Sequence, residues 1–213
     1  AVQQVADNMM IRGMCEDGDY LWFIPPTFNG LFKMHKDTWL TEYMGGFSCE
    51  NPYQWSPYGD IVKVGSKLFF APFSANAIGV YDIIESEFSS IPINLDLVEK
   101  DDSYSGKNSY YAAVFEQKIF FMPRSFPAFI VLDTESNEVR YITDWKEKLK
   151  KLPSFNSEAP ISYKGSVVDH SRVFLPCFNA NALLELDMRE ERVNVIELGT
   201  FKHCYCANCY DGK

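Results

Sequence analysis

Long apolar segments are missing from this chain of 213 residues. No hydrophobic run approaches the roughly 18 residues that a membrane-spanning helix requires, and residues 1–7 lack the charged and then apolar parts of a secretory signal. We therefore expect no membrane partner. With 46% hydrophobic and 15% aromatic residues, the chain still has enough apolar material for a substantial core.

Positive charge is scarce as well. The 20 lysine and arginine residues are outnumbered by 29 aspartate and glutamate residues, which gives a net charge of −9. This charge repels phosphate backbones, so we expect no nucleic-acid partner. Lysines gather only at 146–152, where we expect Asp144 to cap a short helix with Trp145, Leu149 and Leu152 on one face. We interpret this segment as an inserted, solvated helix, with a binding element as the alternative.

Recognisable catalytic motifs are also absent. The chain has three histidines and no G-x-S-x-G nucleophile elbow. Two of the histidines, His35 and His170, stand where other parts of the chain have acidic residues, which favours roles in turns or at strand ends. We predict no catalytic residue and no cofactor.

The six cysteines form no disulfide framework of the kind found in small secreted domains. We therefore predict a cytoplasmic protein, with secretion as the alternative, because a domain of this size does not depend on disulfides. Cys204, Cys206 and Cys209 lie close to His203, and these are ligand types that zinc accepts. Their spacing favours packing inside a strand, so we predict no metal site.

What the chain does contain is a four-fold internal repeat with a period of about 50 residues. Each unit has a hydrophobic strand that follows a short polar turn and ends in proline. These strands are expected at 21–25, 68–72, 119–123 and 173–176. A further apolar strand with a polar stop follows in each unit, and the stops are His35, Asp82, Asp133 and Asp187.

A fourth strand completes each unit and is clearest at 88–95, 139–143 and 192–198. Four short antiparallel strands per unit are typical of a β-propeller blade. The predicted fold is therefore all-β, a single propeller domain or part of one over residues 1–213. We expect blades at about 8–47, 55–97, 107–145 and 158–199, and the first strand of a fifth blade at 200–213.

The C-terminal residues resemble the start of the first unit, because Cys209 to Lys213 match Cys15 to Asp19. A lone strand leaves an open edge, which predicts a fragment of a larger propeller. Two alternatives are a strand that closes the first blade and pairing with a second copy. The former is less favoured because residues 9–15 already supply that strand.

Loops between the second and third strands are the favoured ligand site, because each contains a phenylalanine and they share one face with the connections between blades. The candidate residues are Phe28, Asn29, Phe73, Asn76, Arg124, Phe126, Phe178, Asn179 and Asn181, with Tyr58, Tyr111 and Tyr163 from the connections. The interpretation that we favour over ligand binding is that the phenylalanines fill gaps between blades and the asparagines support turns.

The recurring carboxylates Asp82, Asp133 and Asp187 have two interpretations. Paired acids at a suitable separation would serve glycoside hydrolysis. Recurrence at one position of the repeat instead favours a shared structural role, such as accepting backbone hydrogen bonds in the following turn.

The pattern of a hydrophobic-aromatic-aromatic-x-Pro strand, then Asn, then apolar-x-apolar-Asp resembles the kelch and galactose-oxidase-like propellers over residues 8–213. The single glycine pair, Gly45-Gly46, does not recur as kelch glycines do, so no family binding residue is transferred. Similarity to galactose oxidase would imply a copper site, which three scattered histidines do not suggest.

Fold and motifs together predict a non-enzymatic module that binds a protein or glycan through its loop face. The alternative is a carbohydrate-active enzyme, a glycoside hydrolase or lyase, with acids at the channel mouth.

Overall fold

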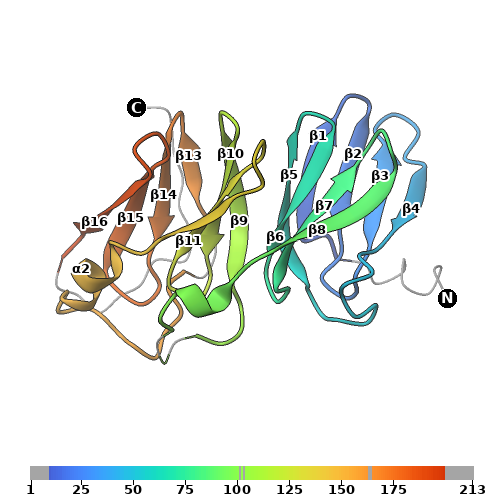
Figure 1. Ribbon diagram of the computed structural model, residues 1–213. Helices are drawn as coiled ribbons and strands as arrows, with labels where there is room; N and C mark the ends of the chain where they lie inside the picture. The colour runs from blue at the N-terminus through green and yellow to red at the C-terminus, as the bar shows by residue number, and fades with distance from the viewer. Residues whose placement is uncertain (1–9, 101, 103, 163–164, 200–213) are drawn as a thin grey trace. The chain divides into compact units, whose positions relative to one another are not determined.

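Four antiparallel sheets make up the computed structural model, which describes residues 10–100, 102, 104–162 and 165–199 (Figure 1). The first two sheets contain β1 (Gly13–Asp17), β2 (Tyr20–Ile24), β3 (Leu31–His35) and β4 (Thr41–Gly45), then β5 (Tyr58–Val64), β6 (Lys67–Pro72), β7 (Ala77–Asp82) and β8 (Glu87–Pro92). The next two contain β9 (Ser109–Phe115), β10 (Lys118–Pro123), β11 (Phe129–Asp133) and β12 (Val139–Ile142), then β13 (Val167–Asp169), β14 (Arg172–Pro176), β15 (Ala182–Asp187) and β16 (Arg192–Glu197).

Each sheet is a meander in which every strand pairs with its neighbour along the chain. The all-β prediction and the four four-stranded blades are confirmed. We number the blades 1 to 4 in chain order. The first strand was misplaced, because β1 covers Gly13–Asp17 and not residues 9–15. The predicted strand of a fifth blade, at 200–213, lies outside the described residues.

The inner strands read as continuous apolar runs because both of their faces are covered. Successive side chains of a strand point to opposite faces. In β2, Trp22 packs against Tyr81 of blade 2, with ring centroids 5.6 Å apart. Its neighbour Phe23 stacks on Phe32 at 5.4 Å on the opposite face. Aromatic and β-branched residues favour such strands.

The strand-end carboxylates cap the following turns, as their recurrence predicted. Asp82 Oδ1 accepts hydrogen bonds from the backbone N–H groups of Ile84 and Glu85, at 3.0 and 3.3 Å. Asp133 and Asp187 each accept two equivalent backbone bonds, and Asp133 also accepts one from the Ser136 hydroxyl. In blade 1, His35 Nδ1 takes this role and accepts from Asp37 and Thr38.

Contacts divide the chain into two compact units, Ala1–Ile93 and Asn94–Lys213. In the first unit, residues of blades 1 and 2 share a core that includes Trp22, Leu31, Phe47 and Phe70. In the second, blades 3 and 4 share another core, which includes Phe120, Phe129, Leu175 and Leu184. Each unit is thus a pair of blades with its own buried side chains.

Two short helical segments lie in the second unit, the 3-10 helix η1 (Leu95–Leu97) and α2 (Lys146–Lys150). The predicted Asp144 cap of α2 is wrong, since Trp145 is the N-cap residue and makes no side-chain cap bond. Trp145 and Leu149 are buried in the core of this unit, and the indole N–H of Trp145 donates to the Ile142 carbonyl at 3.0 Å. Neither described helix has the length and apolarity to cross a membrane.

Candidate functional site

Asn29 organises the loop end of the first unit. This side chain lies in the β2–β3 loop and is 5% exposed. Its amide nitrogen donates to the carbonyls of Phe47 and Glu50, at 2.7 and 3.3 Å. Its amide oxygen accepts from the Phe47 N–H at 3.0 Å. One side chain therefore shapes the connection between β4 and β5, residues 46–57.

Two proline carbonyls tie that connection to the neighbouring loops. The Pro26 oxygen accepts from both the N–H and the hydroxyl of Ser56, at 2.7 and 3.0 Å. The Pro57 oxygen accepts from the N–H groups of Phe73 and Ser74, at 2.9 and 3.1 Å. Because these bonds cross from one loop to the next, the β2–β3 loop, the β4–β5 connection and the β6–β7 loop form one interlocked layer.

An arginine and two aromatic rings stack within this layer. The Arg12 guanidinium carbon lies 4.3 Å from the centroid of Phe73 and 5.4 Å from that of Trp55, which is cation–π geometry. Phe73 is 3% exposed, whereas Trp55 is 55% and its neighbour Tyr53 is 89% exposed. Large aromatic side chains at a held surface position are typical of recognition surfaces.

Sequence reasoning missed Tyr53 and Trp55 because the candidates from the connections between blades were limited to Tyr58, Tyr111 and Tyr163. The available signal was two aromatic residues between Pro52 and Pro57, in the connection that precedes β5.

Tyr58 is the first residue of β5, directly after Pro57 of the layer, and is 3% exposed. Burial raises the pKa of its phenol, and the nearby Glu50 carboxylate and Cys49 raise the pKa further. Its ring packs 4.7 Å from that of Phe47. A phenol that stays protonated inside an aromatic cluster contributes packing to this region.

In the second unit, Arg124 connects blade 3 to blade 4. Its guanidinium Nη1 donates to the Ser162 carbonyl, and its own backbone oxygen accepts from the Ser162 N–H at 3.2 Å. The Ser162 hydroxyl donates to the Pro123 carbonyl. The adjacent Phe126 is fully buried. These contacts lie within the protein and serve the joint between the two sheets.

The β14–β15 loop holds Phe178, Asn179 and Asn181. Phe178 is half-buried, and both asparagines are buried. The Asn179 backbone oxygen accepts from the Asn156 N–H at 2.7 Å. The Asn181 amide donates to the Gly199 carbonyl at 3.0 Å, and its N–H donates to the Ser154 hydroxyl at 2.9 Å.

The remaining predicted site residues differ in exposure. Asn76 is exposed, and Phe28 and Tyr111 are half-buried. Phe28 packs against Phe32 with ring centroids 5.9 Å apart, and Tyr163 lies outside the described residues. Within the first unit the structure thus brings Asn29 and Phe73 into one layer, and within the second it brings Arg124 close to Ser162. Ligand binding by these residues stays a prediction.

Metal ligands do not gather in the part of the chain that the structure describes, where no three His, Cys, Asp or Glu side chains come together. The cysteine and histidine cluster at 203–209 lies outside it. Cys15 is half-buried, and burial together with the Asp17 carboxylate raises the pKa of its thiol to about 11. This thiol therefore stays protonated at neutral pH.

Comparisons by sequence identify no relative, since no family model and no curated protein matches the chain. The resemblance to kelch propellers is therefore not confirmed. Solved structures do match, and they are β-propeller-like. The extracellular domain of the one-component system BT4673 from B. thetaiotaomicron has a TM-score of 0.63 at 11% identity, over 95% of this chain and 25% of that one.

Streptogramin B lyase matches with a TM-score of 0.61 at 12% identity, over 90% of this chain and 56% of that one. The computationally designed protein Ika8 matches with a TM-score of 0.58 at 7% identity, over 94% of this chain and 52% of that one. The chain thus spans between about a quarter and about half of the length of these structures. At such low identity the likeness shows the fold, which is that of β-propeller blades.

Proposed function

We propose that this chain is a non-enzymatic binding module that recognises a protein or a glycan through the loop end of its blades. The observation that carries this proposal is the pair of exposed aromatic side chains, Tyr53 and Trp55, held on an interlocked layer of loops. The hydrogen bonds of Asn29 and the stacking of Arg12 position that layer before a ligand arrives. A preformed aromatic surface loses little conformational entropy on binding.

The fold supports a binding role in general terms. Propeller-like neighbours include an extracellular domain of a one-component system, and loops on a rigid sheet scaffold are common sites of recognition. Streptogramin B lyase is an enzyme of the same general fold. In the present chain the recurring carboxylates Asp82, Asp133 and Asp187 are engaged as turn caps, so we do not propose the glycoside hydrolase or lyase alternative.

Substitution of the exposed pair tests the proposal. Trp55→Ala combined with Tyr53→Ala should reduce retention of the chain on an array of glycans and peptides by at least about tenfold, because central aromatic contacts at interfaces are worth about 2 kcal/mol or more. The melting temperature should change little, since both side chains are mostly exposed.

Ile84→Ala is the matched control. Ile84 is 75% exposed in the same unit, but it lies in the β7–β8 turn, away from the loop layer. Loss of binding in the double variant with retention in the control supports the proposal. Unchanged binding by the double variant would refute it.

We further propose a cytoplasmic location, because Cys15, Cys49 and Cys177 are all free thiols. Fractionation of the source cells, with a cytoplasmic and a secreted marker, checks this assignment.

A further inference from the structure

One corner of blade 1 departs from the internal repeat at several neighbouring positions. The four blades can be compared through their strand registers, in which Tyr20 pairs with His35 as Lys67 pairs with Asp82. The positions equivalent to Tyr20 hold Lys67, Lys118 and Arg172, and those equivalent to His35 hold Asp82, Asp133 and Asp187. In blades 2 to 4 a lysine or arginine therefore pairs with an aspartate. In blade 1 a tyrosine pairs with a histidine at the same position.

The adjoining β3–β4 turn departs in the same way. Trp39 has a φ of 59°, and the equivalent left-handed positions are occupied by the smaller or polar residues Ser86, Asn137 and Glu191. A bulky residue in this conformation is strained. Trp39 and Leu40 are nevertheless 70% and 75% exposed. The left-handed conformation is shared by all four hairpins, so what distinguishes blade 1 is the choice of a large, exposed apolar residue at this position.

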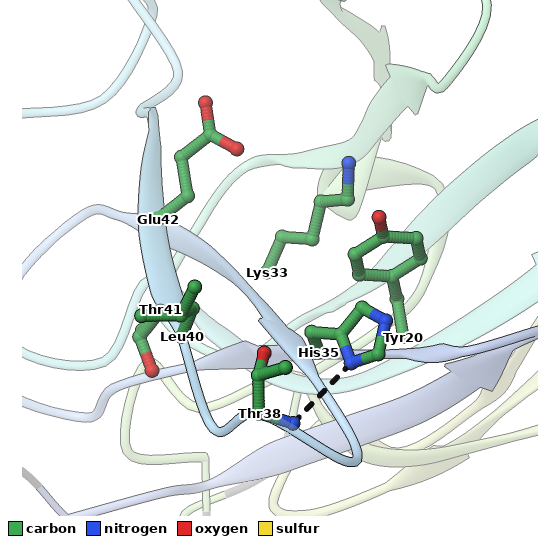
Figure 2. A pocket seen from close by; sticks show the side chains of 7 residues that line it. All are labelled: Tyr20, Lys33, His35, Thr38, Leu40, Thr41 and Glu42. Atoms are coloured by element: carbon green, nitrogen blue, oxygen red, sulfur yellow. Dashed lines mark hydrogen bonds between the residues drawn. The ribbon is translucent and has the colours of Figure 1, made fainter.

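Tyr20, His35 and Leu40 line a pocket of about 240 Å³ beside this turn (Figure 2). Its lining comprises Tyr20, Lys33, His35, Thr38, Leu40, Thr41 and Glu42. The volume is somewhat below the range of about 300–1,000 Å³ that is usual for drug-sized ligands. It fits a single small ring with polar substituents.

A cation and an anion face this pocket without forming an ion pair with each other. Lys33 and Glu42 are opposite each other on β3 and β4, so both side chains leave the same face of the sheet, as Figure 2 shows. Among the ion pairs of the described residues, none includes Lys33 or Glu42. The Lys33 ammonium instead lies 4.2 Å from the Tyr20 ring centroid and 5.5 Å from that of Trp22, which holds it in place.

His35 adds a donor of known orientation. Its Nδ1 accepts hydrogen bonds from Asp37 and Thr38, so in the neutral imidazole the proton is on Nε2. Its ring meets Tyr20 edge-on at 5.2 Å. The turn cap therefore also fixes the imidazole that lines the pocket.

We propose that this pocket binds a neutral monosaccharide unit. Each sugar hydroxyl both donates and accepts, so one ring can accept hydrogen bonds from Lys33 and His35 while it donates to the Glu42 carboxylate. A simple anion would be repelled by Glu42 and a simple cation by Lys33. The apolar face of the sugar packs on Leu40. This site lies on the turn end of blade 1 and is independent of the loop layer around Trp55.

The test uses the whole 213-residue chain and a panel of free D-glucose, D-galactose, D-mannose, L-fucose and N-acetyl-D-glucosamine. The readout is the imidazole nitrogen and proton shifts of His35 in NMR spectra, with His170 as an internal reference outside the pocket. At least one sugar should shift the His35 signals in a saturable manner, with a dissociation constant of about 1 mM. The His170 signals should not move.

Two variants assign the contacts. Lys33→Met keeps the aliphatic packing on Tyr20 and removes the charge, and Glu42→Gln removes the anion. Each should weaken binding by at least about tenfold, as loss of a charged hydrogen bond does. Ser89→Ala, at the position of blade 2 equivalent to Glu42, should leave the affinity unchanged. Melting curves confirm that each variant is folded.

Three results would overturn the assignment. The first is that no sugar of the panel shifts His35. The second is a shift that both pocket variants leave intact. The third is that glycine or acetate moves the His35 signals more strongly than every sugar does, because the pocket would then select charge over hydroxyl groups.

Discussion

Asn29 shows how much structure a single side chain supports. Its three hydrogen bonds satisfy the backbone at both Phe47 and Glu50. In a site that is almost fully buried, loss of the amide leaves those backbone groups without partners. Asn76 has the corresponding place in the next loop of the sequence, but its side chain is exposed. Asn29 therefore has a structural role in the loops, whereas the Asn76 side chain is available at the surface.

We expect Asn29→Ala to lower the free energy of unfolding by about 2–4 kcal/mol, because several buried hydrogen bonds are lost at once. Asn76→Ala should change it by less than about 0.5 kcal/mol, as is usual for exposed positions. Urea denaturation of both variants measures the difference. Equal losses at the two positions would contradict the assignment of Asn29 as the organiser of the loop layer.

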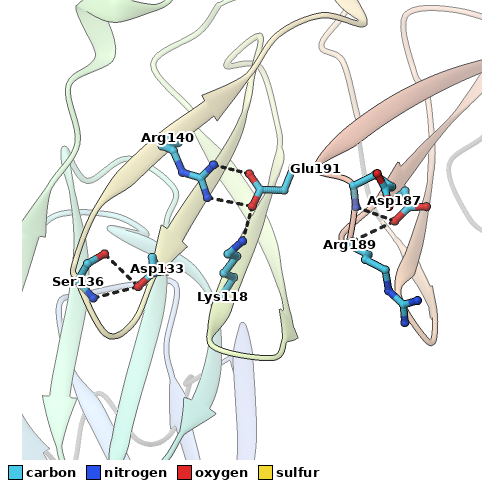
Figure 3. Close-up of polar contacts among 8 residues, drawn as sticks. Lys118, Asp133, Ser136, Arg140, Asp187, Arg189 and Glu191 are labelled. Atoms are coloured by element: carbon cyan, nitrogen blue, oxygen red, sulfur yellow. Dashed lines mark hydrogen bonds and ion pairs between the residues drawn. The ribbon is translucent and has the colours of Figure 1, made fainter.

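At the scale of strands and turns, one carboxylate joins blades 3 and 4. Glu191 in the β15–β16 turn pairs with Lys118 of β10 at 2.6 Å and with Arg140 of β12 at 2.7 Å (Figure 3). Burial by itself would raise the pKa of Glu191, but the hydrogen bonds and positive charges of Lys118 and Arg140 outweigh it and lower the pKa below the ordinary value. The folded state therefore favours the ionised form.

This lowered pKa predicts how the stabilisation by the Glu191 ion pairs depends on pH. The stabilisation is fully present above the ordinary glutamate pKa of about 4.3 and is lost as the pH falls through the lower, folded-state pKa. Glu191→Gln should cost about 1 kcal/mol at neutral pH, in the upper range for partly exposed pairs. The difference from the natural chain should shrink as the pH is lowered through the folded-state pKa, because the Glu191 side chain is then protonated. Urea titrations at neutral pH and at a series of acidic pH values check this, and a pH-independent difference would mean that packing dominates.

Element boundaries and turn roles were predictable to the extent that they depend on local patterns. The proline-terminated strands and the caps at Asp82, Asp133 and Asp187 follow from the repeat itself. The prediction of an Asp144 cap was wrong because Trp145 packs in the core against residues of other strands. A local sequence pattern contains no information about such distant contacts. The pocket around Lys33 was missed for a related reason, since it depends on departures from the repeat.

On the scale of the whole molecule, apolar side chains on the outer face of blade 1 deserve a test. Met14, Phe23, Phe32 and Tyr43 form one row across its four strands. Met14 and Tyr43 at its ends are 51% and 45% exposed. Exposed apolar side chains of this size are typical of contact surfaces between protein chains. A second copy of the chain is the partner that we expect to cover them.

We therefore expect the isolated chain to associate, with a mass by light scattering above the 24.5 kDa of one chain. Met14→Lys together with Tyr43→Lys should shift the population toward the single chain, because two charges would be desolvated in the contact. Ile84→Lys, in the exposed β7–β8 turn of blade 2, is the control for added charge. A single-chain mass at every concentration would exclude this association.

The turn caps have a practical consequence. Asp82, Asp133 and Asp187 each belong to the strand that they terminate, and each holds the hairpin that follows through its own backbone bonds. A hairpin whose turn is stabilised by its own hydrogen bonds depends little on the remainder of the protein. Foreign peptides grafted at these tips would be displayed on a scaffold that already supplies the bend.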